Sequence, residues 1–171
     1  MRAYKFMREG AVSPFSGARW TVGEWMEGGP GAPDPCRQGV HACRPADLPY
    51  WLNRELWEVE LDGEIAETEY KLVAERGRLV RRVDRWERRT YRRFAEACAA
   101  EVRALGVDDV AHDCNIVIDK GAYGLAVYFA AVGAERAGGE EGRAAERRRQ
   151  AEWLGEHVLA PGRRRLFRRR S

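Results

Sequence analysis

The 171-residue sequence has no long run of apolar residues, either at its N-terminus or further along the chain. A helix that spans a bilayer needs about 20 consecutive apolar residues. A secretory signal peptide also needs an uninterrupted apolar segment. We therefore expect a cytoplasmic protein that does not interact with membranes.

The sequence also has little cysteine and even less lysine. Four cysteines in 171 residues are too few for a dense disulfide scaffold, so reduced thiols are expected. Arginine greatly outnumbers lysine, and an arginine-, alanine- and glycine-rich chain is typical of a GC-rich genome. Codon usage is therefore an alternative to function as the explanation of any basic patch. Lysine occurs at Lys5, Lys71 and Lys120.

Four arginines follow the spacing of one helix face, namely Arg85, Arg88, Arg89 and Arg92. Such a stripe can follow the phosphates of a nucleic acid. Acidic residues are interspersed, so a solvated helix face is the alternative. The basic segment Arg163–Arg170 has the same two interpretations, nonspecific binding of nucleic acid or codon usage.

Residues 1–83 carry the patterns of short β-strands. Leu56–Leu61 alternates apolar and polar side chains, which is typical of a half-buried strand. Gly39–Cys43 is a short apolar run, and we predict that it forms a central strand paired with Leu56–Leu61. Pro45 then predicts the start of a short helix over Ala46–Leu52.

Two turns and a first strand complete the predicted sheet. Ala3–Met7 alternates and predicts the first strand. Asp62-Gly63 predicts a hairpin turn, with Glu64–Tyr70 as the returning strand. Glu75–Gly77 predicts a second turn. The sheet should therefore be small and mostly antiparallel.

From Asp84 onward the apolar period becomes helical, and Gly106 ends the first predicted helix. Further helices are predicted over Ala122–Arg136 and Glu140–Leu159. The apolar segment Asn115–Ile118 is consistent with a strand or with the end of a loop.

The fold class expected is therefore α+β, a small antiparallel sheet followed by a C-terminal helical layer. We predict a β-rich domain over residues 1–83, a helical region over 84–160 and a basic, disordered tail over 161–171.

Cysteine and histidine lie close together in one segment. Cys36, His41 and Cys43 are ligands of the kind that zinc takes, and His112 with Cys114 repeats the His-x-Cys spacing. Structural zinc sites use tighter cysteine pairs, so we expect no metal. A cysteine nucleophile paired with histidine is the second interpretation, but no nucleophile elbow is present.

Four matching segments resemble a domain of unknown function found in small phage and actinobacterial-type proteins. They are Ala3–Lys5, a C-x-x-G-[FV]-H-A-C motif over Cys36–Cys43, the pair Tyr50-Trp51, and Val59–Glu64. The resemblance covers roughly residues 1–83. It implies a family but no established activity.

A fainter resemblance is to the ADP-ribosyltransferase fold. Gly39–Ala42 with Tyr50, followed by Leu56–Gly63, is similar to the strand, short helix and next strand at the centre of that fold. This resemblance implies an enzyme that uses NAD and encloses nicotinamide between aromatic residues. His41 stands in place of the strand tyrosine, and Tyr50 matches the helix tyrosine.

The match to this fold is incomplete at two functional positions, one on the first strand and one for the catalytic glutamate. The first strand offers Tyr4 and Lys5 where the fold has histidine or arginine. No catalytic glutamate can be assigned, and Glu67, Glu69 and Glu75 are candidates by position only.

A geometric argument brings the candidate ligand-binding residues together. Alternate residues of a strand point to opposite faces, so an inward Val40 and Ala42 send His41 and Cys43 to the other face. The short helix then carries Tyr50 over that face. A neutral imidazole beside a phenol suits a planar polar ligand such as a nucleobase or nicotinamide. The predicted ligand-binding residues are His41, Tyr50, Tyr4, Lys5 and Cys43.

The alternative for His41 is a buried core histidine hydrogen-bonded to the backbone. Three functions remain open at this point. The first is a module that binds a small molecule or a protein partner, the second an NAD-using transferase, and the third a nucleic-acid-associated protein.

Overall fold

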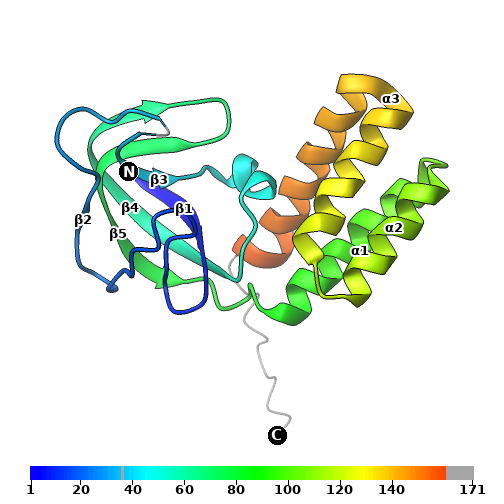
Figure 1. Ribbon diagram of the computed structural model, residues 1–171, viewed down its shortest axis with the longest axis horizontal. Coiled ribbons are helices and arrows are strands. Elements are labelled where there is room, and N and C mark those ends of the chain that lie inside the picture. The colour runs from blue at the N-terminus through cyan, green and yellow to red at the C-terminus, as the bar shows by residue number, and fades with distance from the viewer. Residues whose placement is uncertain (36, 161–171) are drawn as a thin grey trace, which may run out of the picture.

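A computed structural model describes residues 1–35 and 37–160 of the chain. The fold class is α+β, as predicted, with a five-stranded antiparallel sheet followed by helices (Figure 1). Its strands run in the order β1-β4-β5-β2, and β3 pairs with β5. The strands are β1 (Arg2–Met7), β2 (Met26–Glu27), β3 (Val40–Ala42), β4 (Glu55–Glu67) and β5 (Leu72–Arg82).

Strand β3 closes the pairing of four strands into a ring. One side of β3 pairs with the start of β5, from Leu72 to Ala74. On the other side, Cys43 exchanges two backbone hydrogen bonds with Tyr4 of β1, at 2.9 and 2.7 Å. Since β1 pairs with β4 and β4 with β5, the circuit is complete. One apolar cluster belongs to these strands and includes Ala3, Met7, Val40, Ala42, Val59, Leu61 and Leu79.

The predicted pairing of Gly39–Cys43 with Leu56–Leu61 is wrong. Strand β1 pairs with Glu55–Glu60 along one edge of β4, and β5 lies along the other edge. Because both edges of β4 are occupied there, β3 pairs with the free edge at the start of β5 instead.

The predicted turns at Asp62-Gly63 and Glu75–Gly77 are also wrong, because both segments lie inside long strands. Gly63 has a φ of +80° at a register shift in β4, which is a β-bulge. Gly77 lies within β5, where an added Cβ would come 2.8 Å from Cγ1 of Val40. The chain reverses at residues 68–71, where the amide of Thr68 donates to the carbonyl of Lys71.

A short helix and a helical layer complete the fold. The short 3₁₀ helix η1 lies between the sheet and the helices in Figure 1. A π-helical turn, η2, ends the described helical segment. The elements are η1 (Pro45–Tyr50), α1 (Arg88–Ala104), α2 (Asp108–Asp119), α3 (Tyr123–Leu154) and η2 (Gly155–Leu159).

Helix α3 consists of two antiparallel arms. Gly138 and Gly139 have non-helical backbone angles and reverse the chain, at the point where a helix boundary is predicted. Beyond them, Arg143 forms a 2.6 Å ion pair with Glu135, and the Gln150 amide donates to the carbonyl of Val127. Figure 1 shows the two arms side by side.

The apolar segment Asn115–Ile118 belongs to helix α2, so its interpretation as a strand or loop is wrong. The buried residues of α2 are Ala111, Cys114 and Ile118, which are spaced three and four residues apart. That spacing is helical, and a short apolar run alone does not reveal it.

The sheet and the helices share a second apolar core. Phe6 of β1, Leu48 of η1 and Leu56 of β4 pack in one cluster with Phe94 and Cys98 of α1. This shared core fixes η1 between the two layers. The described residues contain no helix that is both long and apolar enough to cross a bilayer. The predicted division into domains stays a prediction, and the predicted tail over 161–171 lies outside the described residues.

Candidate functional site

A cavity of about 220 Å³ lies between β1, β3, η1 and the β4–β5 turn. All five residues predicted for ligand binding line it. Its other walls are mainly aromatic and apolar, and they include Phe15 and Trp51. That these residues bind a ligand stays a prediction. The five predicted lining residues are Tyr4, Lys5, His41, Cys43 and Tyr50.

Strand alternation decides which face His41 takes. Val40 and Ala42 are buried in the cluster of the strand ring, and His41 between them is half-buried at the cavity. The ammonium of Lys5 donates a 2.6 Å hydrogen bond to the backbone carbonyl of His41. This bond links β1 to β3 across the wall of the cavity.

His41 and Lys5 of the cavity both have lowered pKa values. Burial, together with the positive charges of Lys71 and Lys5, lowers the pKa of His41 to about 4. Burial also lowers the pKa of Lys5 to about 8. At neutral pH the imidazole is therefore neutral, and the Lys5 ammonium lies close to its titration range.

The pKa of the Cys43 thiol is raised, whereas an activated cysteine has a lowered pKa. Burial raises its pKa to about 12, and the negative charge of Asp47 acts in the same direction. Its Sγ donates to the carbonyl of Tyr4 at 3.3 Å. A thiol that stays protonated is a poor nucleophile, so Cys43 serves as a wall of the cavity.

Tyr50 is held at the end of η1 by contacts from two other elements. Its ring stacks on that of Tyr70, with 4.1 Å between the ring centroids. The guanidinium of Arg147 in α3 lies 4.7 Å from the Tyr50 ring centroid. Arg147 also donates to the carbonyl of Pro49 at 3.1 Å. The helical layer therefore fixes one wall of the cavity.

The residues that line the cavity beyond the five predicted for ligand binding include Phe15, Trp51 and Lys71. Trp51 donates from Nε1 to the carbonyl of Tyr70 at 2.7 Å, and Phe15 packs edge-on against it with ring centroids 6.3 Å apart. Lys71 lies 6.0 Å from the centroid of the Trp51 ring. The rarity of lysine was the available signal, because Lys5 and Lys71 both line this one cavity.

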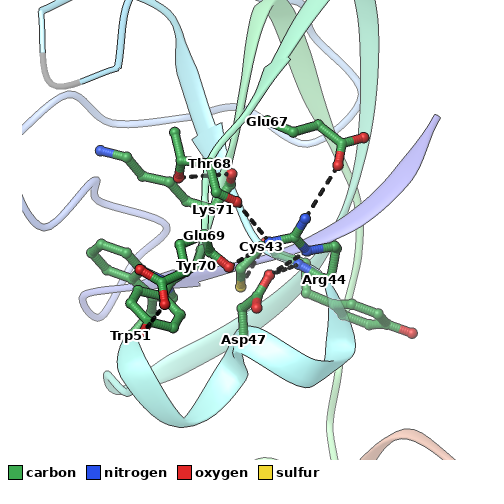
Figure 2. Close-up of polar contacts among 10 residues, drawn as sticks. Cys43, Arg44, Asp47, Trp51, Glu67, Thr68, Glu69, Tyr70 and Lys71 are labelled. Atoms are coloured by element: carbon green, nitrogen blue, oxygen red, sulfur yellow. Dashed lines mark hydrogen bonds and ion pairs between the residues drawn. The ribbon is translucent and has the colours of Figure 1, made fainter.

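Arg44 links η1 to the β4–β5 turn through hydrogen bonds, as Figure 2 shows. Its guanidinium donates to the carboxylates of Asp47 at 2.6 Å and Glu67 at 3.2 Å. It also donates to the backbone carbonyls of Thr68 and Glu69, at 2.9 and 2.8 Å. The turn carries Tyr70 and Lys71, so this network sets the position of both beside η1.

The three candidate glutamates lie outside the cavity lining. Glu67 pairs with Arg44, and Glu69 accepts a hydrogen bond from the hydroxyl of Tyr70. The Glu75 side chain lies against Gly63 in the bulge. None of them is placed to act on a molecule bound beside His41.

The described residues include no group of three or more histidine, cysteine, aspartate or glutamate side chains arranged to hold a metal. Cys36 lies outside the described residues, so the expectation about zinc stays a prediction.

The four arginines with helical spacing are all exposed, before and within the first turns of α1. Arg92 forms a 2.8 Å ion pair with Glu96, and Arg85 donates to the carbonyl of Ala160. Arg88 lines a separate hollow that includes Tyr91. A role in nucleic-acid binding stays a prediction for this stripe.

His41 should make the stability of the protein depend on pH. Since its pKa falls from 6.5 to about 4 on folding, the unfolded chain takes up a proton first as the pH drops. This contribution is complete above about pH 6.5 and is lost toward pH 4. Between pH 7 and pH 4 we expect the free energy of unfolding to fall by about 1–2 kcal/mol less in His41→Gln than in the wild type, after allowance for solvent screening.

Urea unfolding of the wild type and His41→Gln at both pH values measures this difference. The control is His112→Gln, which changes an exposed histidine on α2 and should leave the loss unchanged. Equal losses in the wild type and His41→Gln would contradict the prediction.

Comparison with known proteins identifies one family. A family model described as Domain of unknown function (DUF7666) matches residues 1–89. The matched range contains all five strands, η1 and every lining residue of the cavity. No curated protein and no solved structure matches the chain.

Proposed function

The chain belongs to the family of the domain of unknown function DUF7666, and on this premise we propose that the matched domain binds a small, planar, polar molecule. The single observation that carries the proposal is the cavity beside His41. It lies wholly within the family domain, which favours a function that belongs to the domain itself.

The size and the walls of the cavity support a single-ring ligand. Pockets for drug-sized molecules are about 300–1,000 Å³, and this cavity is smaller, at about 220 Å³. Phe15, Tyr50 and Trp51 offer aromatic surfaces against which a flat ring can pack. A partly open hollow of this size holds a small molecule, whereas a specific protein partner needs a far larger contact surface.

A few polar groups converge on these apolar walls, as in ligand sites generally. A neutral imidazole has one nitrogen that donates and one that accepts, so His41 suits a ring with both kinds of polar atom. Tyr50 and Lys5 add further polar atoms at the same cavity. A nucleobase or a nicotinamide ring has this combination of flatness and mixed polarity.

Binding is better supported than catalysis. Cys43 is a protonated thiol, and the described lining contains no carboxylate to act as a general base. The NAD-using transferase and the nucleic-acid-associated protein stay predictions for this chain.

The proposal is tested by a thermal-shift screen of the full chain with single-ring polar compounds, nucleobases, nicotinamide and NAD. Hits are then measured by calorimetry against the wild type, His41→Ala and His112→Ala. We expect His41→Ala to weaken binding at least tenfold, because it removes both polar atoms of the imidazole ring.

His112→Ala is the matched control, since it is the same substitution at an exposed position on α2. It should bind as the wild type does. The proposal fails if no compound raises the melting temperature, or if His41→Ala binds every hit as tightly as the wild type. A strong preference for NAD over nicotinamide would favour the transferase alternative.

A further inference from the structure

We propose that the ligand of this cavity is a planar single-ring carboxylate, and that the ammonium of Lys5 is its counter-charge. This inference rests on the proposed binding function and adds the charge of the ligand. Three features of the cavity carry it, namely the burial of Lys5, the sign of the charges around it, and the aromatic walls.

Lys5 is buried with little to balance its charge. Only 8% of the surface of this residue is exposed to solvent. An ammonium has three donors, and among the described residues Lys5 makes one side-chain hydrogen bond, to the carbonyl of His41. The Lys5 ammonium lies 5.4 Å from the centroid of the Trp20 ring, and none of the ion pairs among the described residues includes Lys5.

A buried charge without a charged partner is unfavourable, and proteins normally pair such groups. A ligand carboxylate at the cavity would supply the missing partner. The ammonium would then donate charge-assisted hydrogen bonds to the ligand oxygens, and such bonds are stronger than those between neutral groups.

The walls of the cavity favour an anion as well. The described lining contains two lysines, Lys5 and Lys71, and no aspartate or glutamate. The nearby carboxylate of Asp47 is engaged by Arg44. The lining groups therefore attract a negative charge, and none of them repels it.

The remaining walls limit the rest of the ligand to a flat ring. Phe15 and Trp51 form an edge-to-face pair at the cavity, and Tyr50 lines it from η1. The volume of about 220 Å³ suits one ring and a short substituent. Benzoate and nicotinate have this shape, and their amides are neutral molecules of almost the same size.

The test compares each acid with its amide, benzoate with benzamide and nicotinate with nicotinamide, by calorimetry on the full chain at pH 7. We expect the wild type to bind at least one acid at least tenfold more tightly than the matching amide. Lys5→Gln keeps a donor for the His41 carbonyl but removes the charge. In this variant the preference should fall to twofold or less.

Lys120→Gln is the matched control, because it removes an exposed lysine at the end of α2 and should keep the full preference. Acids and amides that bind the wild type equally would overturn the inference and leave the proposed function standing. A preference that survives in Lys5→Gln would also overturn it. Failure of both pairs while other library compounds bind overturns the charge inference alone, and failure of the whole library overturns both.

The pH dependence gives an independent readout of Lys5. Burial lowers the Lys5 pKa to about 8, and an anion prefers the protonated form. The affinity for the acid should be level from pH 6.5 to about 8 and then fall, approaching tenfold per pH unit, while Lys5→Gln stays level. A level profile in the wild type up to pH 9.5 would contradict the role of Lys5.

His41 and Cys43, which flank Lys5 in the cavity, do not imitate this profile. The pKa of His41, about 4, and that of Cys43, about 12, both lie outside the range from pH 6.5 to 9.5. The charged and titratable groups that line the cavity or the adjoining hollow with Lys5 are Tyr4, His41, Cys43, Tyr50, Lys71, Glu27 and Arg37.

Discussion

Replacing Gly39 with alanine should lower the free energy of unfolding by about 3–4 kcal/mol and disrupt the cavity beside His41. Gly39 has a φ of +117°, a conformation that a residue with a Cβ rarely adopts. An added Cβ would also lie 2.3 Å from Cγ1 of Val73 and 3.2 Å from the carbonyl oxygen of Ala74. Backbone strain and overpacking each cost about 1–3 kcal/mol, and here they act together.

The neighbours of Gly39 leave little room for relaxation. Its amide donates to the carbonyl of Gly28 at 2.7 Å, and the amide of Gly28 donates to the carbonyl of Glu75 at 2.6 Å. Two backbone segments and β5 therefore meet here in close contact. Because Gly39 directly precedes β3, any shift that accommodates alanine also moves His41.

Urea unfolding of the wild type and Gly39→Ala measures the loss of stability. Gly23→Ala is the matched control, since Gly23 also has a positive φ, +85°, but nothing lies within 4 Å of its added Cβ. The control should lose only about 1 kcal/mol from strain. Equal losses in the two variants would show that close packing around Gly39 is not important.

Replacing Arg44 with leucine should cost about 3 kcal/mol and loosen the β4–β5 turn from η1. The substitution removes the four hydrogen bonds that the Arg44 guanidinium donates in Figure 2, to Asp47, Glu67, Thr68 and Glu69. It also leaves the carboxylate of Asp47, a residue only 6% exposed, without its charged partner. Removing one member of a buried pair costs about 3–5 kcal/mol, and the partial exposure of Arg44 places the value at the lower end.

A double-mutant cycle with Asp47→Asn separates the ion pair from the rest of the network. Asp47→Asn alone should cost about 1–2 kcal/mol. The double variant should be more stable than the sum of the two losses predicts, by about 1–2 kcal/mol, because no buried carboxylate remains unpaired. Strict additivity in the urea unfolding experiments would show that the two side chains do not stabilise each other.

Local patterns in the sequence were sufficient for the fold class and for part of the site. Alternation over Leu56–Leu61 correctly predicted a half-buried strand, and Pro45 correctly predicted the start of a short helix. Alternation along Val40–Ala42 also predicted that His41 turns away from the core, and in the structure Val40 and Ala42 are buried in the apolar cluster while His41 is half-buried at the cavity. These properties depend only on neighbours along the chain, because the direction of a side chain in a strand repeats every two residues.

Glycines were misread where their role depends on distant parts of the chain. Gly63 and Gly77 follow residues typical of turns, yet they lie inside β4 and β5. Gly63 allows a bulge beside Glu75, and Gly77 leaves space for Val40. The sequence around a glycine does not distinguish a turn from a close approach of another strand, because both require the absence of a Cβ.

The sequence by itself determined the α+β class, the short strand and helix around His41 and Tyr50, and the presence of two rare lysines in the family domain. Only the tertiary structure decided that β3 pairs with β5, that Lys71 joins Lys5 at one cavity, and that Arg147 contacts Tyr50. Lys5 and Lys71 are 66 positions apart, and Tyr50 and Arg147 are 97 positions apart. Such contacts depend on which strand edge is free and on how the helical layer packs, and these are properties of the whole folded chain.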